Sequence, residues 1–320
     1  MSGDGDLAAV LRGFLHARGP SLGVDLVSHT GENVLTLARV LGTDPAVGRR
    51  ALRTSYLRID ADSPGCARIS PSFLRKFISF TLFGLEGAAQ DGAALDAAFA
   101  ALVDKHRTIS RRKRELAQDL VRELHDLCAA ELTGDFAVLI CGDVVYDLAH
   151  DARRREHSTG IPVRGSDIDL VILLDEPDLH LKDRLETELL KHKYFWLRHP
   201  TIQEELDFII KTPGDVRRQA GLETVKDKIA VKVMMESRVL FEAGDIARRC
   251  AAIVQDPGVR GWFDEAEREA RTRHEQLEAD VYAGLVTDLS AEDRSIFFSA
   301  ELDELGEFCE SRHALTALKP

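Results

Sequence analysis

The stretch Gly165-Ser-Asp-Ile-Asp-Leu-Val-Ile-Leu-Leu174 carries most of the information about the fold. Its second part, Ile168 to Leu174, is rich in isoleucine, valine and leucine, which is typical of a buried strand. Because side chains alternate along a strand, Asp167 and Asp169 are expected on the same face. Two carboxylates held together among apolar side chains need shared protons, basic partners or a divalent cation. Hard cations such as Mg²⁺ take oxygen ligands and bridge to phosphates, so phosphate chemistry is the first hypothesis.

Two further strands are expected near this one. Phe136 to Cys141 (FAVLIC) is a compact apolar run that stops at Gly142, and Leu206 to Lys211 (LDFIIK) is a third strand with one acid, Asp207. If the third strand lies beside the first, its acid joins the Asp-Ile-Asp pair. Three converging carboxylates are a suitable ligand set for two Mg²⁺ ions around a nucleoside triphosphate and an attacking hydroxyl.

Helical patterns occupy much of the remaining chain. We expect helices over residues 34–41, 92–131, 178–193, 216–243 with Gly244 as a C-cap, and much of 259–320. The apolar run at 73–83 and the rest of residues 1–90 give no clear pattern. The expected fold class is α/β (α+β), with a small mixed sheet in the core and mainly helical N- and C-terminal extensions. The expected regions are 1–90 of unclear fold, 91–256 with the core and its flanking helices, and 257–320, helical.

Composition narrows the class of protein. The chain has 320 residues and a formal net charge of −12, so contact with nucleic acid would have to come from local basic patches. No apolar run approaches the ~20 residues needed to cross a bilayer, and the acidic N-terminus lacks the basic flank of a signal peptide. Five scattered cysteines show no metal-ligand spacing and suit a reducing cytoplasm. We therefore expect a cytoplasmic protein without membrane contact.

The order of these features resembles the polymerase-β-like nucleotidyltransferase superfamily. In that family a strand ends in a glycine-led turn, Asp-x-Asp follows on the next strand, and a third Asp lies on a later strand. The matching pieces are Cys141-Gly142-Asp143, Gly165-Ser166-Asp167-Ile168-Asp169-Leu170 and Leu206-Asp207-Phe208. The resemblance covers roughly residues 134–245, where Glu236 to Phe241 also resembles a helical segment that follows the core in many bacterial members.

The resemblance implies transfer of a nucleoside monophosphate (NMP) from an NTP such as ATP to an acceptor hydroxyl, with release of pyrophosphate. Asp167 and Asp169 would hold Mg²⁺ or Mn²⁺, and Asp207 would complete the metal site and help to activate the acceptor. The candidate nucleotide-binding residues are Gly142, Asp143, Ser166, Lys228 and Lys232. The acceptor would be an RNA 3′ end, including tRNA, a protein or a small molecule, with RNA or protein favoured by the extra helical regions. Because many stand-alone bacterial members are toxins or act in defence, a cognate inhibitory protein is a further implied partner.

Two departures from the family pattern concern phosphate binding. Asp143 stands where the family usually has serine, and a carboxylate there repels a triphosphate unless it is turned away or binds a metal. The linker from Asp143 to Ser166 is long enough for an extra helix and contains Arg153, Arg154, Arg155 and Arg164. This run and the segment 105–114 (KHRTISRRKR) are either solvated faces or guides for RNA or triphosphate.

A second hypothesis follows from the first departure. The core would then be a degenerate nucleotidyltransferase that binds nucleotide, RNA or a partner protein without catalysis. Retention of all three acids argues against it, because a binding module has no need for metal-coordinating carboxylates.

Overall fold

The computed structural model describes residues 2–86, 89–128, 132, 134–156, 158–175 and 179–298. It mixes helix (58%) and strand (18%), which confirms the α+β class. The chain forms two compact units, a terminal unit of residues 1–105 and 266–320 and a central unit of residues 106–265. The expected core region, 91–256, thus covers most of the central unit. The expected end regions, 1–90 and 257–320, overlap mainly with the terminal unit.

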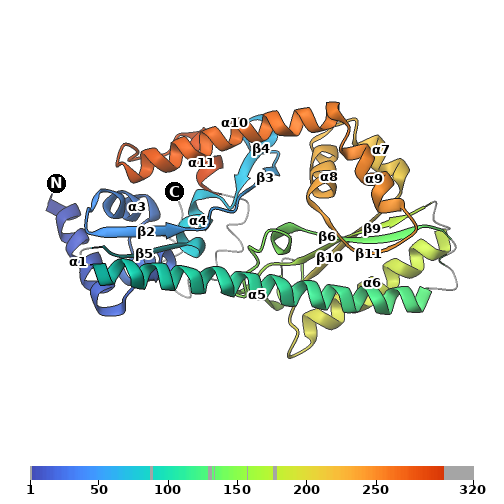
Figure 1. Ribbon diagram of the computed structural model, residues 1–320, viewed down its shortest axis with the longest axis horizontal. Helices are drawn as coiled ribbons and strands as arrows, with labels where there is room; N and C mark the ends of the chain where they lie inside the picture. The colour runs from blue at the N-terminus through green and yellow to red at the C-terminus, as the bar shows by residue number, and fades with distance from the viewer. Residues whose placement is uncertain are drawn as a thin grey trace. The chain divides into compact units, whose positions relative to one another are not determined.

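The central unit is built on a four-stranded mixed sheet with the order β10-β9-β6-β11 (Figure 1). Its strands are β6 (Phe136–Cys141), β9 (Ile168–Leu174), β10 (Leu206–Lys211) and β11 (Arg238–Ala243). Strand β10 runs parallel to β9, whereas β6 is antiparallel to both β9 and β11. The first three strands confirm the bounds expected from their apolar runs.

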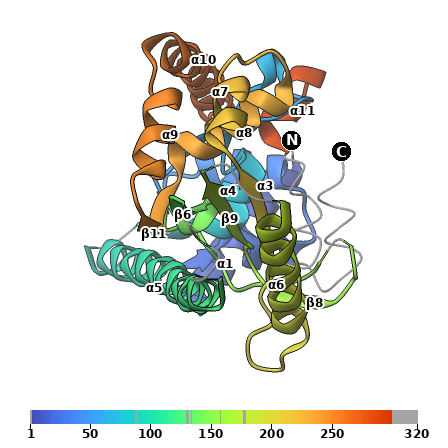
Figure 2. The same cartoon turned by 90° about the vertical axis from the view of Figure 1, so that its right-hand side faces the viewer.

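Helices cover both faces of this sheet (Figure 2). The second half of α5 (Ala89–Cys128) and α6 (Leu179–Arg198) pack on one face. The residues buried there include Leu120, Leu124, Leu185 and Leu189 from the helices and Val138, Ile140, Leu170, Ile172 and Leu206 from the strands. Helices α7 (Pro213–Gln219), α8 (Val225–Glu236) and α9 (Ile246–Val254) contact the sheet elsewhere and lie on its other side. By strand alternation, Asp169 and Asp207 face this second side.

The helix expected over residues 216–243 is wrong in its last part. Thr212 and Thr224 each cap a new helix, so the segment begins as α7 and α8, and α8 ends at Glu236. Residues 238–243 form β11, so the helical segment expected at 236–241 and the C-cap role of Gly244 are also wrong. The physical reason is tertiary: β6 offers an edge of unpaired backbone groups, and β11 satisfies them.

The long linker before β9 carries a β-hairpin in place of the extra helix it has room for. Strand β7 (Arg153–Arg155) pairs antiparallel with β8 (Pro162–Arg164). The linker begins with a single 3₁₀ turn, η2 (Gly142–Val144). Between this turn and β9, its described residues hold no α-helix.

The terminal unit combines helices with two small sheets. Its helices are α1 (Ser2–Arg18), α2 (Gly23–Thr30), α3 (Val34–Thr43), α4 (Phe73–Phe80) and α11 (Ala291–Phe297), together with the larger part of α10 (Pro257–Tyr282). Its strands are β1 (Ser21–Leu22), β2 (Val47–Ala51), β3 (Tyr56–Ile59), β4 (Ala67–Ser70) and β5 (Thr81–Leu85), with the 3₁₀ turn η1 (Pro64–Cys66). They form the sheet β1-β5-β2 and the hairpin β3-β4, so "mainly helical" describes residues 1–90 only in part. Residues 299–320 of the expected C-terminal helical region lie outside the described part.

Among the described residues, no helix combines the length and apolar character required to span a bilayer.

Candidate functional site

The three aspartates singled out in the sequence come together at one end of the central sheet. Asp167 immediately precedes β9, Asp169 is the second residue of β9, and Asp207 is the second residue of β10. The parallel register places Asp207 directly beside Asp169. One carboxylate oxygen from each of the three residues lies within 4.8 Å of the other two, and all three side chains are half-buried. The expected convergence is therefore present.

The glycine-led turn after β6 lies against this triad. Cys141 is paired with Asp169 across the antiparallel strands, so Gly142 follows directly beside that carboxylate. Gly142 has φ of +73°, and a Cβ atom added to it would lie only 2.6 Å from Asp169 Oδ2. Both the backbone conformation and the contact therefore require glycine.

Asp143 and Ser166, both in the candidate nucleotide-binding set, are bonded to each other. The Ser166 hydroxyl donates to Asp143 Oδ2 at 3.1 Å and lies 3.3 Å from the donating backbone N–H of His150. Ser166 is only 2% exposed, so its hydroxyl is committed to this internal contact. Asp143 thus ties the turn to the segment that leads into β9.

The two candidate lysines on α8 have different surroundings. Lys228 Nζ lies 4.7 Å from the ring centroid of Trp262, a cation–π contact. Lys232 Nζ donates to Glu236 at 2.7 Å, and the same carboxylate accepts from the Tyr146 hydroxyl at 3.0 Å.

The charge of Glu236, the partner of Lys232, acts on Cys141 beside the triad. Burial raises the pKa of the Cys141 thiol well above its ordinary value, and the charges of Asp169 and Glu236 raise it further. Since Cys141 is the strand partner of Asp169, Lys232 lies in the neighbourhood of the triad. Lys228 is engaged with an aromatic ring instead.

Lys193 is a site residue that the sequence analysis missed. Its ammonium donates to Asp207 Oδ1 at 2.5 Å from α6. Burial lowers the pKa of Lys193, but the hydrogen bond to Asp207 and its charge outweigh this effect, and the pKa is raised. The position, close to Tyr194 and Phe195 in an amphipathic helix, gave no signal of this contact.

Asp167, just before β9, is unfavourably placed for carrying a charge. Burial raises the pKa of Asp167, and the neighbouring charges of Asp207 and Asp143 raise it further. The charge of Arg154 opposes these effects without cancelling them. A hard cation would favour the ionised form, so a divalent metal fits the chemistry of this donor set.

Two buried ion pairs hold the segments that lead into β9 and β10. The Lys113 ammonium, fully buried on α5, bonds to Glu204 and donates to the carbonyls of Arg164 at 3.0 Å and Ser166 at 2.6 Å. Arg154 donates to the intervening carbonyl of Gly165 at 2.7 Å and pairs with Glu205 at 2.6 Å. We call these four side chains, Lys113, Arg154, Glu204 and Glu205, the brace.

The brace fixes the spacing of the triad. Its two cations donate hydrogen bonds to three successive backbone carbonyls before Asp167. Its two acids, which pair with these cations, lie just before Asp207 in the chain. Burial lowers the pKa of Lys113 despite the attraction of Glu204, and burial raises the pKa of Glu205 despite Arg154. A signal was present in the sequence, because two adjacent glutamates before a buried strand need cationic partners.

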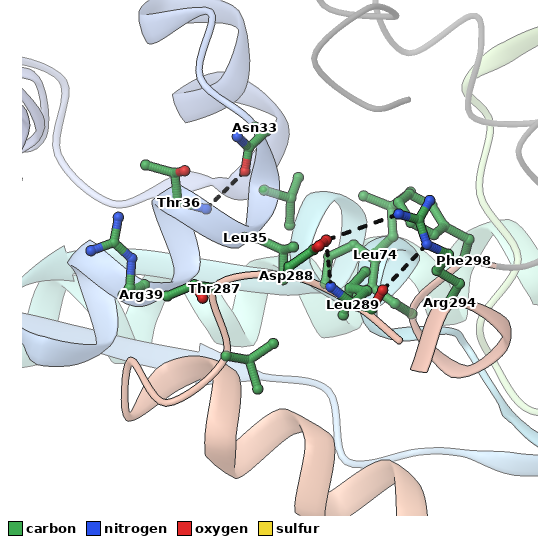
Figure 3. A pocket seen from close by; sticks show the side chains of 13 residues that line it. Asn33, Leu35, Thr36, Arg39, Leu74, Thr287, Asp288, Leu289, Arg294 and Phe298 are labelled. Atoms are coloured by element: carbon green, nitrogen blue, oxygen red, sulfur yellow. Dashed lines mark hydrogen bonds and ion pairs between the residues drawn. The ribbon is translucent and has the colours of Figure 1, made fainter. Parts of the chain in front are cut away.

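A separate cavity of about 250 Å³ lies in the terminal unit (Figure 3). The first turn of α3, helix α11 and the loop before α11 line it. Its two arginines are already engaged: Arg39 pairs with Asp4, and Arg294 donates to the Leu289 carbonyl and lies near Asp288. It contains none of the aspartates of the triad, so the candidate chemistry rests on the central unit.

Comparison of the chain with protein-family models, with curated proteins and with solved structures finds no match in any of the three.

Proposed function

We propose that the protein is a metal-dependent nucleotidyltransferase that moves an NMP from an NTP to an acceptor hydroxyl. The observation that carries the proposal is the convergence of Asp167, Asp169 and Asp207 beside the glycine-led turn. When bound, Mg²⁺ or Mn²⁺ would neutralise the triphosphate and stabilise the charge that develops during phosphoryl transfer. The brace, the strand register and Gly142 all serve to set the positions of these carboxylates.

The acids take different roles in this proposal. Asp167 and Asp169, two residues apart at the start of β9, provide the metal ligands from one strand. Asp207 enters from the neighbouring strand and, once released from Lys193, would complete the metal site and take the proton of the acceptor hydroxyl. The hydroxyl oxygen then forms a bond to the α-phosphorus, and pyrophosphate leaves.

The triphosphate would be held beside the acids by backbone and by charge. The backbone of the turn at Gly142 can approach phosphate closely because no side chain intervenes. Lys232 is the better phosphate ligand of the two α8 lysines, because Lys228 lies over Trp262. Substituting Lys232 by glutamine should therefore weaken NTP binding more than the same change at Lys228.

The test is incubation of the protein with each α-³²P-labelled NTP, Mg²⁺ or Mn²⁺, total RNA and cell lysate. The double variant Asp167→Asn/Asp169→Asn runs alongside, with Asp119→Asn as a control because Asp119 is 71% exposed. The proposal predicts label on RNA or protein with the wild type and the control, and none with the double variant. Labelling that survives the double substitution would contradict it.

The same experiment addresses the second hypothesis of a binding module without catalysis. Such a protein would bind nucleotide and transfer no label to any acceptor, even a panel of small hydroxyl compounds. The convergence of three acids favours the catalytic alternative, since binding alone does not need them. The NTP, the acceptor class, an inhibitory protein partner and a cytoplasmic location stay predictions.

A further inference from the structure

The β7-β8 hairpin presents three arginines on one face. Arg153 and Arg155 are exposed and flank buried Arg154, and Arg164 lies directly opposite Arg153 in the antiparallel register. Because strand side chains alternate, Arg153, Arg155 and Arg164 share the outer face, and Arg154 and Val163 share the buried one. We call these three residues the arginine face.

The two guanidinium groups of the cross-strand pair Arg153–Arg164 repel each other. Like charges directly opposite each other on a sheet destabilise the pairing. Neither of these two guanidinium groups has an acidic partner among the described residues, in a chain that carries 54 acidic and 42 basic residues. Acidic side chains are abundant, yet none of those that the structure describes pairs with either guanidinium group. An external anion would relieve the repulsion.

The hairpin is joined to the triad by a very short connection. Only Gly165 and Ser166 separate Arg164 from Asp167, and Lys113 and Arg154 hold this connection in place. Arg155 lies one pair further along the hairpin, about 7 Å beyond Arg153 at the usual rise of a strand. The arginine face is therefore a row of positive charge that leads away from the acids.

We propose that the arginine face binds the phosphate backbone of a single-stranded nucleic acid whose 3′ hydroxyl is the acceptor at the triad. A row of cations suits a chain of phosphates better than one triphosphate, whose oxygens must all stay close to the acids. The acceptor role rests on the proposed function. Binding of the strand does not, because it requires neither metal nor NTP.

The test is fluorescence anisotropy with a labelled single-stranded RNA, a DNA of the same sequence and an acidic peptide. It is done in EDTA without NTP, over a series of KCl concentrations. The variant is Arg153→Thr/Arg155→Thr, since threonine suits a strand. The matched control is Arg217→Ala/Arg248→Ala, which removes the same charge from two exposed helical positions of the central unit.

The proposal predicts that the hairpin variant binds the oligonucleotide about 10- to 30-fold more weakly near 0.1 M salt, while the control binds like the wild type. The slope of log affinity against log salt should become shallower by about 1.4, for two lost contacts. Equal affinity for RNA and DNA would identify the backbone alone as the ligand, and tighter RNA binding would add the 2′-hydroxyl.

Three results would overturn the proposal: no binding by the wild type, equal loss in the control, or an acidic peptide bound as tightly as the oligonucleotides. Misfolding of the variant is checked by its Tm, which should be unchanged or higher because like charges are removed. The Asp167→Asn/Asp169→Asn protein should still bind the strand. Failure of catalysis and failure of strand binding therefore give separate results.

Discussion

The triad and the brace are two groups of acids in different surroundings. In the brace, Glu204 and Glu205 each have a buried cation, Lys113 and Arg154, and those cations also satisfy backbone carbonyls. In the triad, three aspartate carboxylates lie close together, and Asp207 accepts a hydrogen bond from the Lys193 ammonium.

This difference separates a structural ion pair from a binding site. The two cations and two acids of the brace balance in charge, so the brace needs no additional ion. The triad gathers three acids, and the pKa of Asp167 is raised by its burial and by the neighbouring acids. The brace stabilises the arrangement that keeps the triad in this state. Substitutions in the two groups should therefore have opposite consequences.

The largest effect is expected on activity. Replacing Asp169 or Asp207 by asparagine should lower NMP transfer by about 10³- to 10⁴-fold, because a metal ligand that stabilises the reacting phosphate is lost. Single-turnover transfer of ³²P-labelled nucleotide measures this loss. Asp119→Asn should transfer at the wild-type rate, and comparable rates for all variants would remove the triad from the mechanism.

The next effect concerns the stability that the brace provides. Lys113→Met leaves Glu204 buried with only the half-exposed Arg112 as a partner, so unfolding should become easier by about 3–5 kcal/mol. Urea denaturation measures the change. Lys191→Met, which removes a surface pair with Glu188, should change the free energy of unfolding little. A small effect of Lys113→Met would show that the brace does not hold the site.

Replacing an acid of the triad should raise the stability of the metal-free protein instead of lowering it. Asp167→Asn removes a buried charge that the protein disfavours, so the metal-free protein should gain about 2–4 °C in Tm. The same variant should lose the thermal stabilisation that Mg²⁺ with NTP gives to the wild type. Thermal unfolding in EDTA and in Mg²⁺ measures both. A lower Tm in EDTA would mean that Asp167 is a structural acid like Glu204.

The stability of the metal-free protein should depend on pH through the carboxyl group of Asp167. Its raised pKa means that, above the ordinary value of 3.8, the folded protein holds a proton that the unfolded chain has already lost. The contribution of Asp167 to the free energy of unfolding of the metal-free protein therefore falls as pH rises through this window. A bound metal must displace that proton, so stabilisation by Mg²⁺ should grow from pH ~4 upward. Parallel Tm series with and without Mg²⁺ test this, and a constant difference would contradict it.

The smallest effect should come from Lys193. Its ion pair with Asp207 competes with a metal for the same carboxylate. Lys193→Met should therefore tighten Mg²⁺ binding, by roughly 3- to 10-fold for a partly exposed pair. Calorimetric titration measures the constant. Weaker binding would show that Lys193 helps to build the metal site.

Much of the central sheet could be predicted because its strands are short apolar runs. Phe136–Cys141, Ile168–Leu174 and Leu206–Lys211 have the expected bounds, and alternation correctly places the aspartates. Strand β11 could not be predicted in this way. Residues 238–243 continue a helical pattern, and only the open edge of β6 turns them into a strand.

The cationic partners of the acids could not be predicted from the sequence for a similar reason. Lys113 belongs to a run that reads as a solvated basic face, yet it is fully buried because Glu204 comes from a distant segment. Lys193 and Asp207 meet across a helix and a strand. Such pairs depend on tertiary packing, which local composition does not record.

The most direct test of the central claim is diffraction from crystals soaked in Mn²⁺ with a non-hydrolysable NTP, recorded at a wavelength where manganese scatters anomalously. We expect an anomalous peak in contact with Asp167 and Asp169, absent from the Asp167→Asn/Asp169→Asn protein. Manganese bound only elsewhere, with these carboxylates free, would contradict it.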